Sequence, residues 1–188
     1  MIKIGITGSL SSGKSTAVKF LKKSKYPAFS ADQTVRQLYQ NKIFLKKIRL
    51  VFKIKKKSDV KKQIKAKIIE DKNNLKKLEI LTHPFVRKKM FNFMKKHKSD
   101  KISIYEIPLL VESKLIKKFN IVIFIGAPKN TRLKRYLKLG GSKLFFKVLD
   151  GRQLSQKNKM RLCDHIIVNN KSLFVLKKNI RNIIELYE

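Results

Sequence analysis

Residues 8–15 carry the spacing of a phosphate-binding loop. The stretch Gly8-Ser-Leu-Ser-Ser-Gly13-Lys14-Ser15 fits the pattern G-x-x-x-x-G-K-[ST]. Glycines at the two ends permit backbone angles, and an approach to a phosphate, that a Cβ would oppose. Successive N–H groups of such a loop form an anion nest, Lys14 can reach the β- and γ-phosphates, and the Ser15 hydroxyl can bind Mg²⁺. We therefore predict a nucleotide-phosphate site formed by Gly8, Ser11, Ser12, Gly13, Lys14, Ser15 and Thr16.

The residues on either side of this loop have the patterns of the elements that it should join. Residues 2–7, Ile-Lys-Ile-Gly-Ile-Thr, form a short β-branched run that is typical of a strand. Residues 15–23 predict a helix that opens on the loop and adds its unpaired N–H groups and dipole to the anion site. Its apolar face would consist of Ala17, Val18, Phe20 and Leu21. Strand, glycine-rich turn and helix make an accidental match in a lysine-rich chain the less favoured interpretation.

Four further apolar runs predict the remaining strands of a sheet. They are short, and helical patterns separate them, as expected for buried parallel strands. Helices are predicted at residues 33–39, 129–139 and 172–187, and over the basic stretch 41–98 except for a loop or frayed turn at 53–57. We therefore predict an α/β fold with a five-stranded, doubly wound parallel sheet, in one domain over residues 1–188. The other four strands would lie at residues 26–30, 102–107, 121–126 and 163–169.

Local patterns give finer expectations for several of these helices. In the stretch 41–98, one helix would bury Ile43, Leu45 and Ile48 with Val51 or Phe52. A second would begin near Asp59 and bury Val60, Ile64 and Ile68, and a third would be interrupted at Pro84. Gly140-Gly141 should end the helix 129–139, and the basic residues 142–161 are expected to be mobile in part.

Composition limits the class of protein. The chain has 188 residues and is 43% hydrophobic, which is enough for a domain with a core and is unlike a disordered chain. No apolar run approaches the ~18 residues that a membrane span needs, and the first residues run directly into a strand without the pattern of a signal peptide. The single Cys163 cannot form an internal disulfide. These features favour a cytoplasmic protein.

The charge is the unusual feature of the composition. There are 47 Lys and Arg residues against 12 Asp and Glu, a formal net charge of +35. Binding of RNA or DNA through phosphates would explain this excess. Mutational bias explains it as well, because lysine, isoleucine and asparagine have AT-rich codons. We favour the second explanation, because nucleic-acid modules usually concentrate their charge on one face or tail, and these lysines are spread over the whole chain.

The loop alone does not separate motors, GTPases and kinases. A GTPase would need a base-reading Asn-Lys-x-Asp stretch, which the chain does not contain, and a motor is usually larger. A small metabolite kinase fits the size, with a short second strand, a helical substrate segment and a late basic lid.

Five motifs in order resemble the dephospho-CoA kinase family over nearly the whole chain. Residues 7–16, TGSLSSGKST, resemble the family's TGGIGSGKST, and residues 30–36, SADQTVR, resemble its DADxIAR. Residues 81–87, LTHPFVR, are similar to LHPxxR, and residues 106–112, EIPLLVE, to DVPLLFE. The segment 153–169 is similar to the family's Q…K…ADYVIDN, with Lys159, Asp164 and Asn169 in step.

This resemblance implies phosphoryl transfer from ATP, with Mg²⁺, to the ribose 3′-hydroxyl of dephospho-CoA. It implies a single P-loop kinase domain with a core of residues 1–40 and 100–188, a helical CoA-binding segment at about 41–98, and a lid at about 138–160. Asp32, Lys14 and Arg135 would be catalytic, with Asp32 as general base and Arg135 near the ATP phosphates. Ser15 and Glu106 would hold Mg²⁺. The substrate would contact Asp32, Arg36, His83, Arg87, Glu106 and Leu109.

Each of the acidic candidates also has a structural interpretation. Asp32 could cap the helix 33–39, Glu106 could be a solvated acid at a strand end, and Glu112 could cap a helix. His83 could equally make a structural hydrogen bond to a neighbouring turn.

The sequence departs from the family's pattern at three places. Ser30 replaces the first acid of DAD, and Lys138-Leu139 and Leu149 stand where the lid usually has arginines; Arg152 is a possible substitute for the second arginine. Lysine lacks the bidentate fork that suits phosphate. The runner-up functions are another small nucleoside or nucleotide kinase of this fold and an RNA-associated P-loop protein. We expect no specific nucleic acid, no membrane and a monomer.

Overall fold

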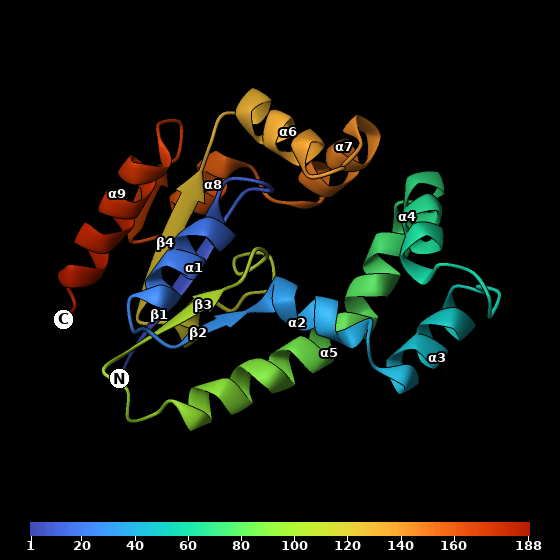
Figure 1. Cartoon of the computed structure of the whole chain (residues 1–188), viewed down its shortest axis with the longest axis horizontal. Coiled ribbons are helices and arrows are strands. Elements are labelled where there is room, and N and C mark those ends of the chain that lie inside the picture. The colour runs from blue at the N-terminus through green and yellow to red at the C-terminus, as the bar shows by residue number, and fades with distance from the viewer. The chain divides into compact units, whose positions relative to one another are not determined.

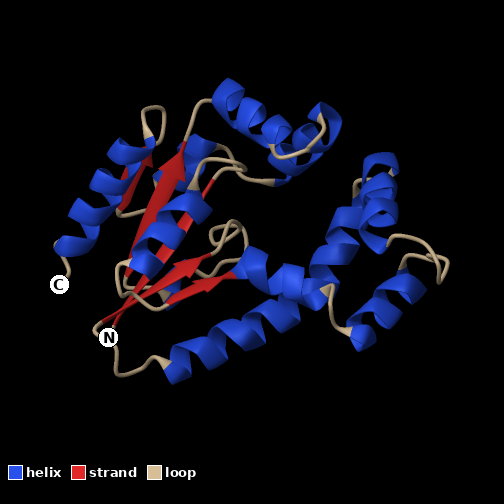
Figure 2. Cartoon of the chain, in the orientation of Figure 1, coloured by secondary structure: helices blue, strands red, loops and turns tan.

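A five-stranded sheet forms the centre of the larger part of the chain. The computed structural model describes residues 1–188, and its helices and strands are shown in Figures 1 and 2. All strand pairs are parallel, in the order β2-β3-β1-β4-β5, which confirms the predicted sheet. The strands are β1 (Ile2–Gly8), β2 (Ala28–Ser30), β3 (Ile102–Glu106), β4 (Ile121–Gly126) and β5 (His165–Val168).

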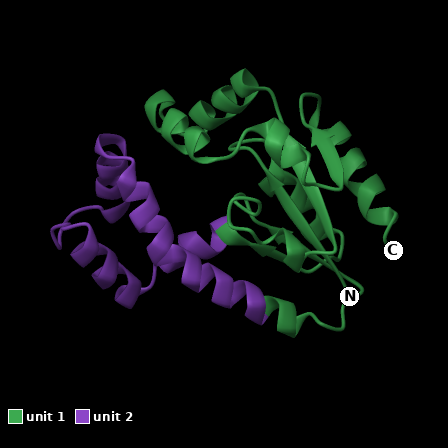
Figure 3. Cartoon of the chain, turned by 180° about the vertical axis from the view of Figure 1, so that it is seen from behind, with its two compact units in different colours: residues 1–31, 93–188 green, residues 32–92 purple.

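The chain divides into two compact units. Unit 1 comprises residues 1–31 and 93–188 and contains the sheet; unit 2 comprises residues 32–92 and is helical (Figure 3). None of the helices is both long and apolar enough to cross a membrane.

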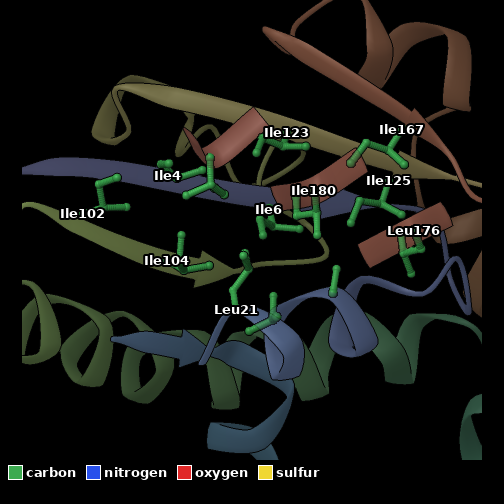
Figure 4. Packing of buried hydrophobic residues seen from close by; sticks show 13 residues of the cluster. Ile4, Ile6, Leu21, Ile102, Ile104, Ile123, Ile125, Ile167, Leu176 and Ile180 are labelled. Carbon is green, nitrogen blue, oxygen red and sulfur yellow. The ribbon is translucent and has the colours of Figure 1, made fainter. Parts of the chain in front are cut away.

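The main core of unit 1 lies between one face of the sheet and two helices, α1 (Lys14–Lys23) and α9 (Leu173–Glu185). Side chains alternate between the two faces of a strand, so every second residue of β1, β3 and β4 points to these helices. Figure 4 shows the isoleucines of the strands meeting Leu21 and Leu176 in this layer. The buried residues of α9 are Leu176, Ile180 and Ile184, while Leu173 at its first turn is half exposed.

The opposite face of the sheet packs through aromatic rings. Tyr105 of β3 is fully buried, with its ring centroid 5.6 Å from that of Phe93 and 5.3 Å from that of Phe119. Phe29 of β2 completes the group, 5.9 Å from Phe93. Gly5 of β1 gives close packing on this face, because a Cβ there would stand 2.7 Å from the end of the Leu110 side chain and 3.1 Å from the Phe119 ring.

The basic stretch 142–161 contains two helices that we did not predict from the sequence. After α6 (Lys129–Lys138) the chain forms α7 (Lys143–Arg152) and α8 (Gln156–Met160), where we expected a basic stretch that is mobile in part. Both helices begin with a serine cap: Ser142 accepts from the N–H of Phe145, and Ser155 from that of Asn158. A single-turn helix, η1 (Ile116–Lys118), precedes β4.

Unit 2 is a group of helices with its own apolar core. Its helices are α2 (Ala31–Leu38), α3 (Lys42–Val51), α4 (Val60–Glu70) and α5 (Asn73–Lys96). The first residue of α2 and the last turn of α5 belong to unit 1. The prediction for α4 is confirmed: Asp59 caps it through the N–H groups of Lys61 and Lys62, and its buried residues are Val60, Ile64 and Ile68.

Two predictions for unit 2 are wrong in part, although Ile48 and Phe52 of the predicted α3 face are buried. α3 buries Phe44 and Ile48, followed by Phe52, whereas Ile43 is 81% exposed; Ile43, Phe44 and Leu45 are adjacent apolar residues that fit more than one helical face. α5 runs through Pro84 as one helix, where we expected an interruption followed by a continuation. Proline removes one hydrogen bond of the helical ladder. The Thr82 hydroxyl adds two bonds to carbonyls of the preceding turn, those of Leu78 and Glu79.

Candidate active site

The ends of all five strands meet at one edge of the sheet, because parallel strands share a carboxyl edge. β1 enters the loop 9–13 there, β3 ends at Glu106, and β5 ends just before Asn169. The residues predicted from the loop pattern therefore lie in unit 1 beside side chains from distant parts of the sequence.

The loop conformation requires glycine at two of its positions. Gly8 has a φ of +148°, and a Cβ on it would stand 2.0 Å from the carbonyl oxygen of Ile125. Gly13 has a φ of +104°, and a Cβ on it would stand 2.3 Å from the Asn169 side-chain nitrogen. The sequence anticipated the unusual backbone angles, but it could not identify the neighbours that make the space so small.

Lys14 is folded into the loop. It is 6% exposed, and its Nζ donates to the carbonyl oxygens of Ser9 at 2.7 Å and Gly8 at 3.1 Å. Gly13, the N-cap of α1, offers no side-chain acceptor to the first turn of this helix. The ammonium and the first N–H groups of α1 thus place positive charge at the same point, as an anion site requires.

Glu106 faces the first turn of α1 and is 2% exposed. It continues the row of Ile102 and Ile104 toward α1, so one carboxylate oxygen, Oε1, accepts a hydrogen bond from the Ser15 hydroxyl. The other, Oε2, accepts from the Ser30 hydroxyl at 2.6 Å, since Ser30 is in register with Glu106 on the neighbouring strand. The alternative that Glu106 is a solvated acid is therefore wrong.

Asp32 lies in the first turn of α2, because this helix begins at Ala31. The alternative that Asp32 is the N-cap of a helix 33–39 is therefore wrong by position. Asp32 belongs to unit 2, as do three other predicted substrate residues: Arg36 in the last turn of α2, and His83 and Arg87 in α5. Leu109 belongs to unit 1, half-buried in the turn after β3.

Two arginines of α6 bind carbonyl groups of the loop. Arg135 donates to the carbonyl oxygen of Ser12 at 3.4 Å and to that of Asn169 at 3.1 Å. Arg132, 4% exposed, donates to the carbonyl oxygens of Leu10 at 3.4 Å and Ala127 at 3.1 Å.

Arg132 also forms a salt bridge with Asp150 of α7. α6 therefore connects the loop to α7. No role for Arg132 was predicted; the only signal in the sequence is its position one turn before Arg135 on the same helix.

A second buried ion pair lies behind the turn that follows β3. Lys159 of α8 is completely buried, and its Nζ is 3.0 Å from Glu112 Oε1 and 2.8 Å from the carbonyl oxygen of Pro108. Glu112 Oε1 also accepts the N–H of Leu154 at 3.0 Å. The idea that Glu112 caps a helix is thus wrong. Burial lowers the pKa of Lys159, and the carboxylate of Glu112 opposes this shift.

The comparisons with known proteins decide the family. The family model described as dephospho-CoA kinase matches residues 2–174. The chain belongs to the dephospho-CoA kinase family. It is 33% identical over 187 residues to the dephospho-CoA kinase of Bartonella quintana, an alignment that covers 97% of this chain and 96% of that protein.

One solved structure of a dephospho-CoA kinase is similar to this chain, and a second solved structure shares its fold. The dephospho-CoA kinase of Campylobacter jejuni has a TM-score of 0.63 and 26% identity, covering 99% of this chain and 97% of that one. TT1252 from Thermus thermophilus shares the fold, with a TM-score of 0.80 and 24% identity over 100% of this chain and 98% of that one. A dephospho-CoA kinase family member is a kinase, which excludes the motor and GTPase classes.

Within this dephospho-CoA kinase family, the serine of the DAD motif acquires a structural explanation. Ser30 stands at the place of the first acid of that motif and donates a hydrogen bond to Glu106, its partner in register on the neighbouring strand. Leu149, at the place of a lid arginine, is half-buried in α7 next to Asp150.

Proposed function

We propose that this protein transfers the γ-phosphoryl group of ATP to the ribose 3′-hydroxyl of dephospho-CoA, giving coenzyme A and ADP. The observation that carries the proposal is the match to the dephospho-CoA kinase family over residues 2–174. The phosphate-binding loop agrees with it, because the Lys14 ammonium lies within the loop, bonded to the carbonyl oxygen of Ser9. The competing nucleoside kinase and RNA-associated functions gain no support from the relatives.

The loop and α1 would bind the β- and γ-phosphates. Phosphoryl transfer depends mainly on positioning and on neutralising charge, and little covalent chemistry is left for the protein. Lys14 can leave the carbonyls of Gly8 and Ser9 and move to the phosphates, which the N–H groups of a loop of this kind would also bind. Arg135 would stand beside them, held at the carbonyl of Ser12.

The residues at the end of β3 fit Mg²⁺. This cation prefers oxygen ligands, and Ser15 and the buried carboxylate of Glu106 supply them in direct contact with each other. Because the Ser15 hydroxyl uses its proton toward Glu106, its lone pairs remain for other partners. When bound, Mg²⁺ would neutralise charge on the β- and γ-phosphates.

Asp32 would be the general base. It follows Ser30 by two residues, at the start of α2, and its carboxylate would accept the proton of the acceptor hydroxyl. Arg36, His83, Arg87 and Leu109 would contact dephospho-CoA, residues 41–98 would be its helical binding segment, and residues 138–160 would form the lid. The pyrophosphate of dephospho-CoA suits a lysine-rich segment of this kind.

Mass detection of coenzyme A tests the proposal. Protein, Mg-ATP and dephospho-CoA should give coenzyme A, whereas Lys14→Ala protein should give none above background. Adenosine, nucleoside monophosphates and shikimate serve as rival acceptors in the same assay. Phosphorylation of a rival acceptor, with dephospho-CoA left unchanged, would refute the proposed substrate.

A further inference from the structure

Asn169 holds the phosphate-binding loop from outside. Its side-chain Nδ2 donates to the carbonyl oxygen of Ser12 at 2.8 Å, and the residue is 7% exposed. Its backbone is fixed as well, since its N–H donates to the carbonyl oxygen of Gly126 at 2.7 Å, at the end of β4. The amide is thus anchored to the sheet before it reaches the loop.

The bond to Ser12 determines the direction of the next N–H group. The Ser12 carbonyl and the Gly13 N–H belong to one planar peptide unit, and in a trans peptide they point in opposite directions. No peptide bond of the chain is cis. With the Ser12 carbonyl directed at Asn169, the Gly13 N–H points away from Asn169.

A second donor and a steric contact support the same orientation. Arg135 donates to the Ser12 carbonyl from α6 and to the carbonyl of Asn169, so the three residues form one cluster. A Cβ on Gly13 would stand 2.3 Å from the Asn169 nitrogen, so the loop and the amide are packed against each other.

We propose that Asn169 is a positioning residue for the nucleotide phosphates: it holds the Ser12–Gly13 peptide so that the Gly13 N–H donates to a phosphate oxygen. The proposal deepens the proposed function and rests on it for the identity of the nucleotide as ATP. Asn169 itself need not touch the nucleotide. The cost of its loss should therefore appear in phosphate binding, whatever the base or the acceptor.

The test measures binding of inorganic tripolyphosphate and of ATP, in the same Mg²⁺ buffer and without any acceptor. Without the amide, the Ser12 carbonyl loses its shorter hydrogen bond, and the peptide is freer to turn. Asn169→Ala and the similarly sized Asn169→Leu should both raise the Kd of tripolyphosphate and that of ATP by the same factor, about tenfold. Asn170→Ala is the matched control, because Asn170 is the exposed neighbour of the same type and should change neither Kd.

Three outcomes would overturn the proposal. If only ATP binding weakens, Asn169 contacts the base or ribose; if neither weakens in folded variants, the amide has a purely structural role. The third outcome needs no variant. When tripolyphosphate is added to the wild-type protein, the NMR chemical shift of the Gly13 amide proton should move downfield. An unchanged chemical shift would refute the inferred direction of this N–H group. A failure to make coenzyme A would count against the proposed substrate but would leave these binding results intact.

Discussion

Replacing Lys159 by methionine should destabilise the protein more than most single substitutions. The side chain is completely buried, with its ammonium between Glu112 Oε1 at 3.0 Å and the Pro108 carbonyl at 2.8 Å. Methionine fills a similar volume but leaves the carboxylate of Glu112, 7% exposed, without its positive partner. The expected effect is therefore electrostatic and not a cavity.

The magnitude follows from the burial of both partners. Removing one partner of a buried ion pair typically costs about 3–5 kcal/mol, because the remaining charge is uncompensated. In a domain of this size each kcal/mol lowers the Tm by about 2–4 °C, so Lys159→Met should lose about 6–20 °C. Replacing both partners costs far less, since desolvation of the two charges offsets most of their attraction.

The assay is a double-mutant cycle on urea unfolding. Glu112→Gln keeps an oxygen for the N–H of Leu154 and removes the charge, so Lys159→Met/Glu112→Gln should recover most of the lost unfolding free energy. The reasoning fails if Lys159→Met costs less than about 1 kcal/mol, or if the double variant is no more stable than Lys159→Met.

The pH dependence of the same cycle follows from the lowered pKa of Lys159. Burial lowers this pKa below its value in the unfolded chain, so the unfolded state binds more protons in the interval between the two pKa values. The unfolding free energy therefore rises with pH in that interval. Relative to the double variant, the wild type should gain stability as the pH approaches the ordinary lysine value of about 10.4. If the unfolding free energy of the wild type instead fell relative to that of the double variant as the pH rises, the expected direction would be contradicted.

Four further experiments address the site and the surface charge. Lys14→Ala should nearly abolish kcat, and steady-state kinetics with unchanged kcat and KM for ATP would remove Lys14 from the site. Asp32→Asn should lower kcat by ~10²–10⁴ with little change in the KM for ATP; near-normal turnover would move the base assignment to Glu106. Leu149→Arg should lower the KM for ATP or raise kcat by adding a charged donor, and no gain in folded protein would mean that Arg152 already has this role. RNA binding in filter assays at physiological salt should have a Kd of about 10⁻⁴–10⁻⁶ M, and nanomolar, sequence-dependent binding would overturn the view that the charge is incidental.

The parts of the fold that depend on local pattern were predictable. β1, β3 and β4 are runs of β-branched residues with turn signals after them, and their ends lie within a residue of the predicted ones. α4 has a capping aspartate and apolar residues at a spacing of four, which fit only one face. The loop between β1 and α1 was the strongest signal, because glycine is required where backbone angles and space exclude other residues.

The errors arose where several local patterns were compatible. Three successive apolar residues, Ile43, Phe44 and Leu45, do not determine which face of α3 is buried, and only the packing of unit 2 selects Phe44. Pro84 destabilises the helix locally, yet α5 continues on both sides of it. At residues 142–161, the basic composition led us to overlook the apolar residues of α7, of which Phe146 and Val148 are buried.

The contacts that complete the candidate site could not be read from the sequence at all. The bonds from Ser15 and Ser30 to Glu106, and from Asn169 and Arg135 to Ser12, join segments that come together only when the sheet forms. The family motif contained Asn169, but a motif does not tell whether a residue binds a ligand or another part of the protein.

Burial sets three basic residues apart from the rest. Of the 47 lysines and arginines, the buried ones are Lys14, Arg132 and Lys159. Each has specific acceptors at the carboxyl edge of the sheet. Lys14 donates to carbonyls of the loop, Arg132 to Asp150 and the Leu10 carbonyl, and Lys159 to Glu112. A buried cation must be paired to be tolerated, whereas an exposed lysine meets no such condition and can accumulate through mutational bias. The net charge of +35 is therefore a property of the surface, and the chemistry proposed for this protein depends on a few basic groups whose positions the fold determines.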